Sequence, residues 1–117
     1  MADFTIYHNP RCSKSRQTLA LLEEQGITTE VVLYLQAPPS AAVIKKLLKQ
    51  LGISARELLR TKEEAFKTLN LGDTGLSDSQ LIKAMHENPK LIERPIVVKG
   101  EQAVLGRPPE NVLSLIG

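Results

Sequence analysis

The sequence predicts an α/β protein in which a βαβ unit comes first, a helical segment follows and a ββα unit closes the chain. Three observations support this fold class. Runs of β-favouring residues stand near the two ends, helical spacing of apolar residues fills the middle, and Gly or Pro separates the runs. At 117 residues we expect a single domain spanning residues 1–117, with a helical insert at about residues 40–90.

The first three predicted elements form the βαβ unit. Residues 4–7 are a short β-favouring run. The leucines between Ser13 and Gly26 suit a helix that ends at a C-terminal glycine. Residues 27–35 are rich in β-branched and aromatic side chains and predict a second strand, which we expect to pair in parallel with the first.

The helical insert begins after the break at Pro38-Pro39-Ser40. Its first helix carries apolar residues at helical spacing and ends at Gly52. Shorter helices are expected up to Leu59, over residues 65–69, and from Ser77 to the stop at Pro89. A Ser or Thr followed three residues later by Glu or Gln predicts three capping boxes, formed by Ser54 with Glu57, Thr61 with Glu64, and Ser77 with Gln80.

The C-terminal part of the chain returns to β structure. Residues 96–98 and 103–105 flank a turn at Gly100, which is typical of a hairpin. A pair of prolines then suits the first turn of a closing helix over residues 110–115. The order βαβ, helical insert, ββα is the connectivity of a thioredoxin-like fold.

The composition excludes several functional classes. A net charge of +2 from 15 basic and 13 acidic residues, with few aromatics, argues against nucleic-acid binding. The absence of a secretory segment or a long apolar run predicts a protein with no membrane contact, and a single cysteine suits the reducing cytoplasm. No phosphate-binding glycine loop or cluster of metal ligands occurs, so we expect no bound cofactor and no metal. We also expect a monomer.

Cys12, the only cysteine, is the strongest candidate for chemistry. It stands where the first strand ends and the first helix begins, and the N–H groups and dipole of a helix N-terminus favour a thiolate. His8, Arg11 and Arg16 are basic neighbours, and Ser15 occupies the position of a resolving cysteine and supplies a hydrogen-bond donor instead. With one thiol, any redox cycle must take a second thiol from another molecule.

Three arginines form a second candidate group. Arg60 follows a helical segment, Arg94 precedes Pro95, and Arg107 lies in a Gly-Arg-Pro sequence. The guanidinium fork matches oxyanions, and in a thioredoxin-like fold the loop before the third strand lies beside the active cysteine. That fold also favours a cis Arg94–Pro95 peptide bond.

Each candidate has a plainer interpretation. A lone cytosolic cysteine is more often an inert buried side chain, although the strand-to-helix position of Cys12 favours a nucleophile. His8 is as compatible with a plain surface or core role as with a role at the thiol. Each arginine, taken singly, is more often a solvated surface charge.

Taken together, the motifs resemble the glutathione- and glutaredoxin-coupled arsenate reductases of the ArsC type, over nearly the whole chain. The matching features are the loop His8-Asn9-Pro10-Arg11-Cys12, the spacing of Cys12 and Ser15, Arg60, the segment Glu93-Arg94-Pro95-Ile96, and Gly106-Arg107-Pro108. One departure is Ser13-Lys14, where members commonly carry Gly-Thr. The resemblance implies a thioredoxin-like fold and a prokaryotic, cytoplasmic protein of arsenic detoxification.

The resemblance also implies a mechanism. Cys12 attacks arsenate, glutathione adds to the arseno-thiol adduct as a co-substrate, and glutaredoxin resolves the mixed species as arsenite leaves. Arg60, Arg94 and Arg107 would hold the oxyanion, and His8 and Ser15 would help keep Cys12 ionised.

Three alternatives stay open at the level of the sequence. The same thiol chemistry suits a glutathione-dependent oxidoreductase acting on a mixed disulfide or another oxyanion. A regulator resembling the Spx proteins, which bind RNA polymerase, is a non-enzymatic alternative that ranks lower because Ser15 replaces the second cysteine of a Cys-x-x-Cys sensor. A structural protein with an inert Cys12 is the third.

Overall fold

The computed structural model describes residues 3–116, which form two compact units. We call residues 3–37 with 94–116 the sheet unit, and residues 38–93 the helical unit. Within the described residues, no helix has the length and apolar character needed to cross a membrane. The interpretation of the chain as a single domain stays a prediction.

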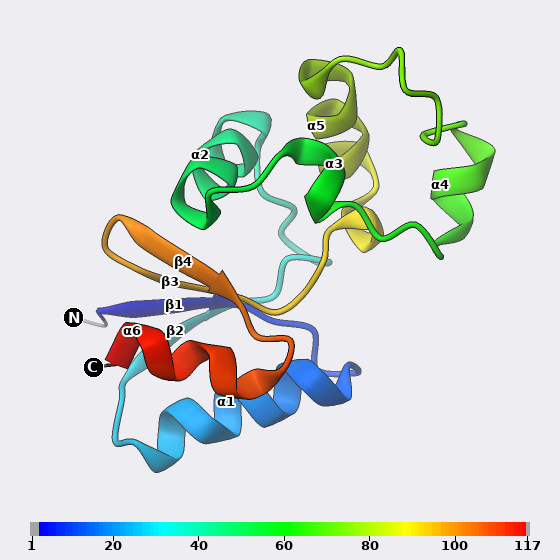
Figure 1. Ribbon diagram of the computed structural model, residues 1–117. Helices are drawn as coiled ribbons and strands as arrows, with labels where there is room; N and C mark the ends of the chain where they lie inside the picture. The colour runs from blue at the N-terminus through cyan, green and yellow to red at the C-terminus, as the bar shows by residue number, and fades with distance from the viewer. Residues whose placement is uncertain (1–2, 117) are drawn as a thin grey trace. The chain divides into compact units, whose positions relative to one another are not determined.

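The sheet unit contains four strands in the order β2-β1-β3-β4 (Figure 1). They are β1 (Phe4–Tyr7), β2 (Thr29–Val32), β3 (Ile96–Lys99) and β4 (Gln102–Leu105). β1 pairs in parallel with β2 and antiparallel with β3, and β3 pairs antiparallel with β4. This topology confirms the predicted thioredoxin-like arrangement, including the parallel βαβ unit and the closing hairpin.

Helix α1 (Ser13–Glu24) and the C-terminal segments η2 (Pro109–Val112) and α6 (Leu113–Ile116) pack on one face of the sheet (Figure 1). Alternating strand residues point to that face, as the pleat requires. The resulting core consists of Phe4, Ile6, Leu22, Val97, Val112 and Leu115. Each such side chain, when fully buried, stabilises the fold by about 1.5–3 kcal/mol.

Two elements of the sheet unit differ from the prediction in length. β2 is shorter than the expected 27–35 because both ends of that run serve other structures: the Ile27 N–H bonds to the Leu22 carbonyl after α1, and the Leu33 carbonyl closes a turn by accepting from the N–H groups at 36 and 37. The closing helix, expected as one element, is a 3₁₀ turn followed by a single α-helical segment.

The helical unit lies between β2 and β3 in the chain, as predicted. The side chain of Ser40 caps the first helix by accepting the Val43 N–H, and Gly52 ends the helix with a positive φ of 70°. Pro89 stops the last long helix and opens a 3₁₀ turn that no pattern predicted. The elements are α2 (Ala41–Leu51), α3 (Ala55–Leu58), α4 (Glu64–Thr68), α5 (Asp78–Glu87) and η1 (Pro89–Leu91).

Two of the three predicted capping boxes are present. Ser54 and Ser77 each accept the N–H three residues on, and the side chains of Glu57 and Gln80 reach back to the cap. The prediction for Thr61 is wrong, because the residue before α4 is Glu63, whose side chain makes no cap hydrogen bond. The Glu63 N–H instead bonds to the Arg60 carbonyl in a turn, which delays the start of the helix.

Candidate active site

The loop between β1 and α1 is held by Asn9. Its side-chain oxygen accepts the Arg11 N–H at 3.0 Å, and its carbonyl accepts the Cys12 N–H at 3.0 Å. Its own N–H donates to the Ser15 hydroxyl at 3.0 Å. These bonds form an Asx-type turn that leads directly into α1. The sequence analysis did not predict this turn, although the Asn-Pro pair is a known signal for one.

Cys12 is the residue before α1, with extended backbone angles, and its side chain is only 8% exposed. Burial disfavours the charged form of its thiol. The backbone N–H groups of Ser15 and Lys14 and the guanidinium of Arg94, which both hydrogen-bonds and attracts the sulfur, outweigh that effect. The net result is a lowered pKa of the Cys12 thiol, as expected for a nucleophile at a helix N-terminus.

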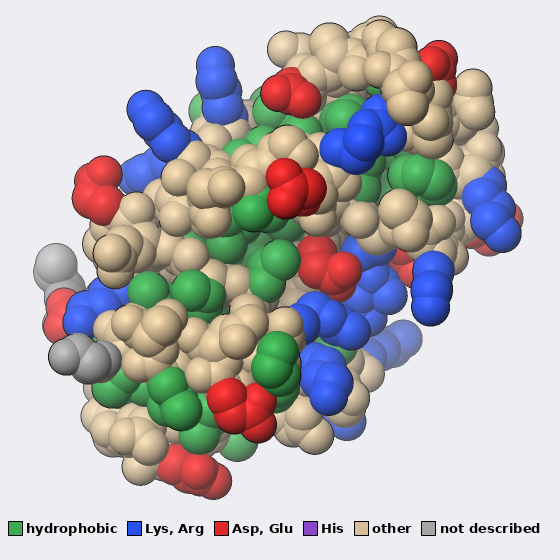
Figure 2. Space-filling view, in the orientation of Figure 1, with side chains coloured by type: hydrophobic (Ala, Val, Ile, Leu, Met, Phe, Trp, Pro, Cys, Tyr) green, Lys and Arg blue, Asp and Glu red, His purple; other side chains and the backbone are tan. Residues whose placement is uncertain are grey.

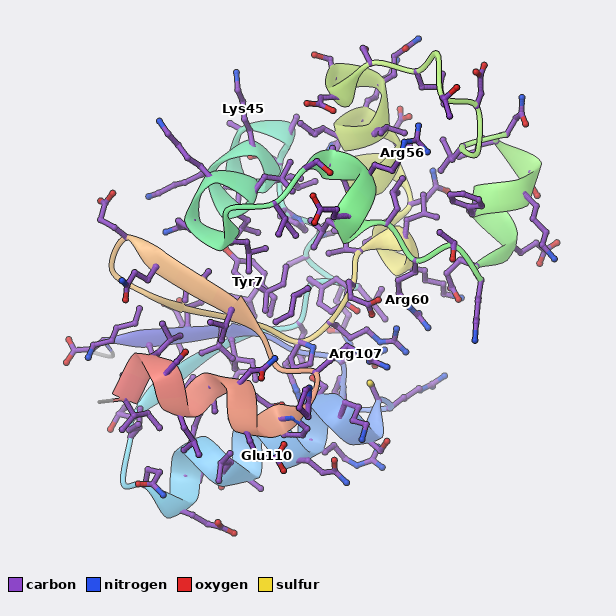
Figure 3. All side chains as sticks on the ribbon, viewed as in Figure 1. Tyr7, Lys45, Arg56, Arg60, Arg107 and Glu110 are labelled. Carbon is purple, nitrogen blue, oxygen red and sulfur yellow. The ribbon has the colours of Figure 1, made fainter. Side chains whose placement is uncertain are left out.

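A second arginine reaches the same sulfur. The Arg107 Nη1 atom lies 4.0 Å from Cys12 Sγ and donates to the Arg94 carbonyl at 3.2 Å. Figure 3 labels Arg107 on the loop that follows β4. The expected cis bond at Arg94–Pro95 is confirmed, and the Arg107–Pro108 bond is also cis, which the sequence analysis missed.

Arg60, the third predicted arginine, belongs to the helical unit. Its Nη1 atom is 3.4 Å from Glu63 Oε2 and its Nε atom is 3.8 Å from Glu93 Oε1. Its backbone N–H donates to the Leu91 carbonyl at 2.8 Å. The structure therefore brings Arg94 and Arg107 to the cysteine, and the oxyanion role of Arg60 stays a prediction.

His8 is buried, with 7% of its surface exposed, and its Nδ1 atom lies 2.6 Å from the Ser15 hydroxyl. Burial, and then the charge of Arg16, lower the pKa of His8, so the imidazole is neutral at pH 7. A neutral ring supplies no positive charge for the thiolate. Its contribution is the contact with Ser15, whose backbone N–H bonds to the Cys12 sulfur.

Ser15 donates to the Cys12 sulfur through its backbone and not through the side-chain hydroxyl that the sequence analysis expected. Its hydroxyl contacts His8 and the Asn9 N–H, whereas its backbone N–H serves the sulfur. The basic neighbour Arg16 is exposed and donates to the Pro10 carbonyl at 2.8 Å, so its side chain braces the loop.

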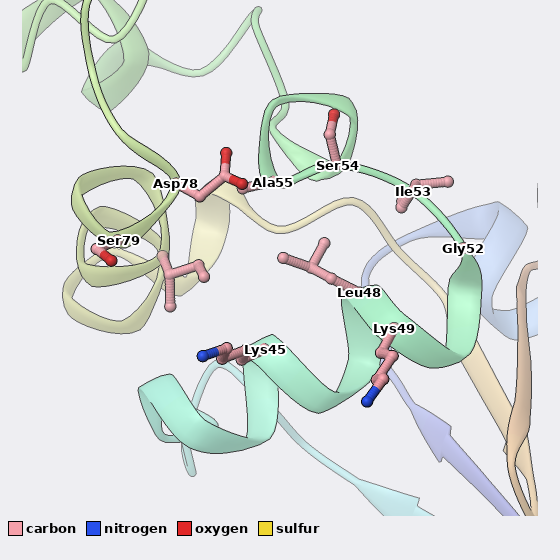
Figure 4. Close-up of a pocket in the computed structure, with 10 residues that line it drawn as sticks. Lys45, Leu48, Lys49, Gly52, Ile53, Ser54, Ala55, Asp78 and Ser79 are labelled. Atoms are coloured by element: carbon pink, nitrogen blue, oxygen red, sulfur yellow. The ribbon is translucent and has the colours of Figure 1, made fainter.

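The helical unit has an open groove of about 710 Å³ between α2, α3 and α5 (Figure 4). Lys45, Lys49 and Asp78 lie along it, and basic side chains project from the α2 region in Figure 2. None of the candidate site residues lines this groove. Residues 3–116 contain no group of three side chains suited to hold a metal ion.

The lowered pKa of Cys12 predicts its reactivity with pH. Alkylation by iodoacetamide should show a rate midpoint below that of a free cysteine thiol, because only the thiolate reacts. Mass spectrometry of samples quenched across pH 5–10 measures this midpoint, with free N-acetylcysteine as the reference. A midpoint at or above the reference would contradict the geometry described for the sulfur.

The site defines a class: a thioredoxin-like protein with one activated thiolate beside two arginines. The sequence profile of the ArsC family matches residues 7–115, and the chain belongs to this family. It is 61% identical over 113 residues to the uncharacterized protein YfgD of Escherichia coli (strain K12), covering 96% of this chain and 95% of that one. It is 52% identical over 112 residues to an arsenate reductase of Haemophilus influenzae, covering 95% of this chain and 97% of that one.

The fold agrees with solved structures of the same family. A structure described as an arsenate reductase from Vibrio cholerae superimposes with a TM-score of 0.94 at 58% identity, covering 97% of each chain. Both sequence and fold therefore match family members over almost their whole length.

Proposed function

We propose that this protein is an oxidoreductase that reduces arsenate to arsenite. The observation that carries the proposal is the Cys12 thiol, whose pKa is lowered and whose sulfur faces both Arg94 and Arg107. A thiolate between two guanidinium groups suits attack on a tetrahedral oxyanion, since the cations bind the substrate and stabilise the charge that develops. Family members of similar length that bear the name arsenate reductase support the same substrate.

In the first step, the Cys12 sulfur attacks the arsenic atom of arsenate. A sulfur–arsenic bond forms and one arsenic–oxygen bond breaks, with the departing oxygen protonated and released as water. Arg94 and Arg107 bind the remaining oxygens, and Arg60 adds a third cation in this proposal. The Ser15 backbone N–H holds the thiolate, and the neutral His8 contacts the Ser15 hydroxyl.

The second step supplies two electrons, which convert arsenic(V) to arsenic(III) as two thiols become one disulfide. The chain has one cysteine, so at least one of these thiols comes from another molecule. Glutathione, as co-substrate, bonds through its sulfur to the arsenic of the adduct, and a second arsenic-bound oxygen leaves as water. A glutaredoxin thiol then attacks the glutathione sulfur: the glutathione–arsenic bond breaks, its electron pair reduces arsenic(V) to arsenic(III), and a glutathione–glutaredoxin disulfide forms. Hydrolysis of the remaining Cys12–arsenic bond releases arsenite and the free thiol. This electron supply belongs to the reducing cytoplasm, where we place the protein as a monomer.

A coupled assay tests this function. Purified protein, arsenate, glutathione and glutaredoxin, with glutathione reductase and NADPH for regeneration, should form arsenite and consume one NADPH for each arsenite. Omission of either glutathione or glutaredoxin should stop turnover, because Cys12 has no intramolecular partner. If the protein turns over a glutathione mixed disulfide or another oxyanion but not arsenate, arsenate is not the substrate, although the thiol chemistry still holds.

A further inference from the structure

Thr18 is a polar side chain inside the sheet unit, on the second turn of α1, and it is 0% exposed. Its hydroxyl oxygen lies 2.7 Å from the Lys14 carbonyl in the same helix. The same oxygen lies 3.3 Å from the Gly106 carbonyl, at the end of the hairpin. Thr18 therefore links the helix that starts at Cys12 to the segment that carries Arg107.

Gly106 allows this approach because it has no side chain. A Cβ atom on Gly106 would lie 2.5 Å from Thr18 Oγ1, 2.9 Å from Thr18 Cγ2 and 2.8 Å from Pro95 Cγ. These distances are well inside van der Waals contact, so a side chain there would force the three segments apart. The Gly106 N–H also donates to the Pro95 carbonyl at 3.0 Å.

This three-residue contact, Thr18 with Gly106 and Pro95, adjoins both arginines of the site. Arg107 follows Gly106 directly, and Arg94 precedes Pro95 directly. A shift in the contact therefore changes the position of both guanidinium groups relative to the Cys12 sulfur. Arg94 hydrogen-bonds the sulfur, and Arg107 Nη1 lies 4.0 Å from it.

We propose that Thr18 is a positioning residue. Its hydroxyl shares one proton between the Lys14 and Gly106 carbonyls, and so ties the first turns of α1 to the Arg107 loop and holds Arg94 and Arg107 at the Cys12 thiolate. The role rests on the proposed function only for its effect on substrate binding. Its effect on the thiol follows from the contacts alone. Thr18 itself touches neither the sulfur nor the substrate in this proposal.

The test replaces the hydroxyl and keeps the shape. Thr18→Val removes the donor to the buried Gly106 carbonyl, and Thr18→Ser retains it. We expect Thr18→Val to raise the pH midpoint of Cys12 alkylation and to raise the arsenate KM by about threefold to tenfold, the effect of one lost hydrogen bond. Its kcat at saturating arsenate should change less, and Thr18→Ser should stay near wild type in both measurements.

A second pair of variants tests the other side of the contact. Gly106→Ala should shift the midpoint in the same direction, because its methyl group would collide with both Thr18 and Pro95 and push them away from residue 106. Gly72→Ala is the matched control, since a Cβ there would meet only the Phe66 ring at an ordinary 3.7 Å.

The outcomes separate this inference from the proposed function. If Thr18→Val lowers thermal stability but leaves the alkylation midpoint at the wild-type value, Thr18 is merely structural and the inference is overturned. If Thr18→Val fails to fold by circular dichroism, the smaller Thr18→Ala variant, which also lacks the hydroxyl, gives the same test. If the wild-type protein does not reduce arsenate, the proposed function fails, and the alkylation midpoints still decide the role of Thr18.

Discussion

Replacement of Cys12 with serine should reduce arsenite formation to the uncatalysed background, a loss of at least about 10⁴-fold. The hydroxyl of serine stays protonated under conditions in which the Cys12 thiol ionises, and it forms no sulfur–arsenic bond. The lowered pKa of the thiol would therefore have no counterpart in the variant. The coupled assay with glutathione, glutaredoxin and NADPH measures this loss.

Ser13→Ala is the matched control for this substitution. Ser13 is the next residue in the chain, is exposed and begins α1, so its change leaves the sulfur contacts intact. Circular dichroism of Cys12→Ser should match wild type, because serine differs from cysteine only by an oxygen atom in place of the sulfur. Arsenate reduction by Cys12→Ser at the wild-type rate would exclude the cysteine as nucleophile.

Replacement of Arg94 with alanine should produce the second-largest effect. We expect kcat/KM for arsenate to fall by about 10²–10³-fold, the cost of removing one donor to a developing oxyanion. The pKa of Cys12 should rise, since the variant loses both the charge and the hydrogen bond of the guanidinium while burial still opposes ionisation. Steady-state kinetics and the alkylation midpoint measure the two effects separately.

The pH dependence identifies the cause of the loss. Because the pKa of the thiol rises in Arg94→Ala, less thiolate is present at pH 7, and part of the activity should return as the pH is raised through the new pKa. The part that does not return reports lost oxyanion binding. Arg94→Lys keeps the positive charge but lacks the planar guanidinium fork. Its kcat/KM should therefore lie between those of wild type and Arg94→Ala.

Arg11→Ala is the control for Arg94. Arg11 is adjacent to Cys12 in the chain and exposed, whereas the backbone N–H groups of Ser15 and Lys14 and the guanidinium of Arg94 lower the pKa of the thiol. Substitution of Arg11 should leave kcat/KM for arsenate within about twofold of wild type and the alkylation midpoint at the wild-type value. An equal loss in Arg11→Ala and Arg94→Ala would mean that overall positive charge, and not the guanidinium at the sulfur, supports the reaction.

Local sequence patterns were sufficient for most of the fold. The caps at Ser54 and Ser77 and the stop at Gly52 were predicted correctly because each depends on residues within one helical turn. The cap at Thr61 was wrong because a turn between Arg60 and Glu63 competes for the same backbone.

The site was only partly predictable, for a related reason. Cys12 and its helix N-terminus are neighbours in sequence, so the reactive thiol was recognisable at once. The Ser15 hydroxyl was expected at the sulfur, but the buried neutral His8 binds it. No sequence pattern marked Thr18, which looks like any polar residue of a helix until the hairpin is packed against it.

The sequence by itself determined the order of elements, the single thiol at the start of α1 and the need for an external electron donor. The tertiary structure alone decided that Arg94 and Arg107 meet at Cys12, because they come from two loops that only the β1–β3 and β3–β4 pairings bring to the start of α1. Such convergence depends on close packing between distant segments, as at the Thr18, Gly106 and Pro95 contact, and local spacing does not encode it.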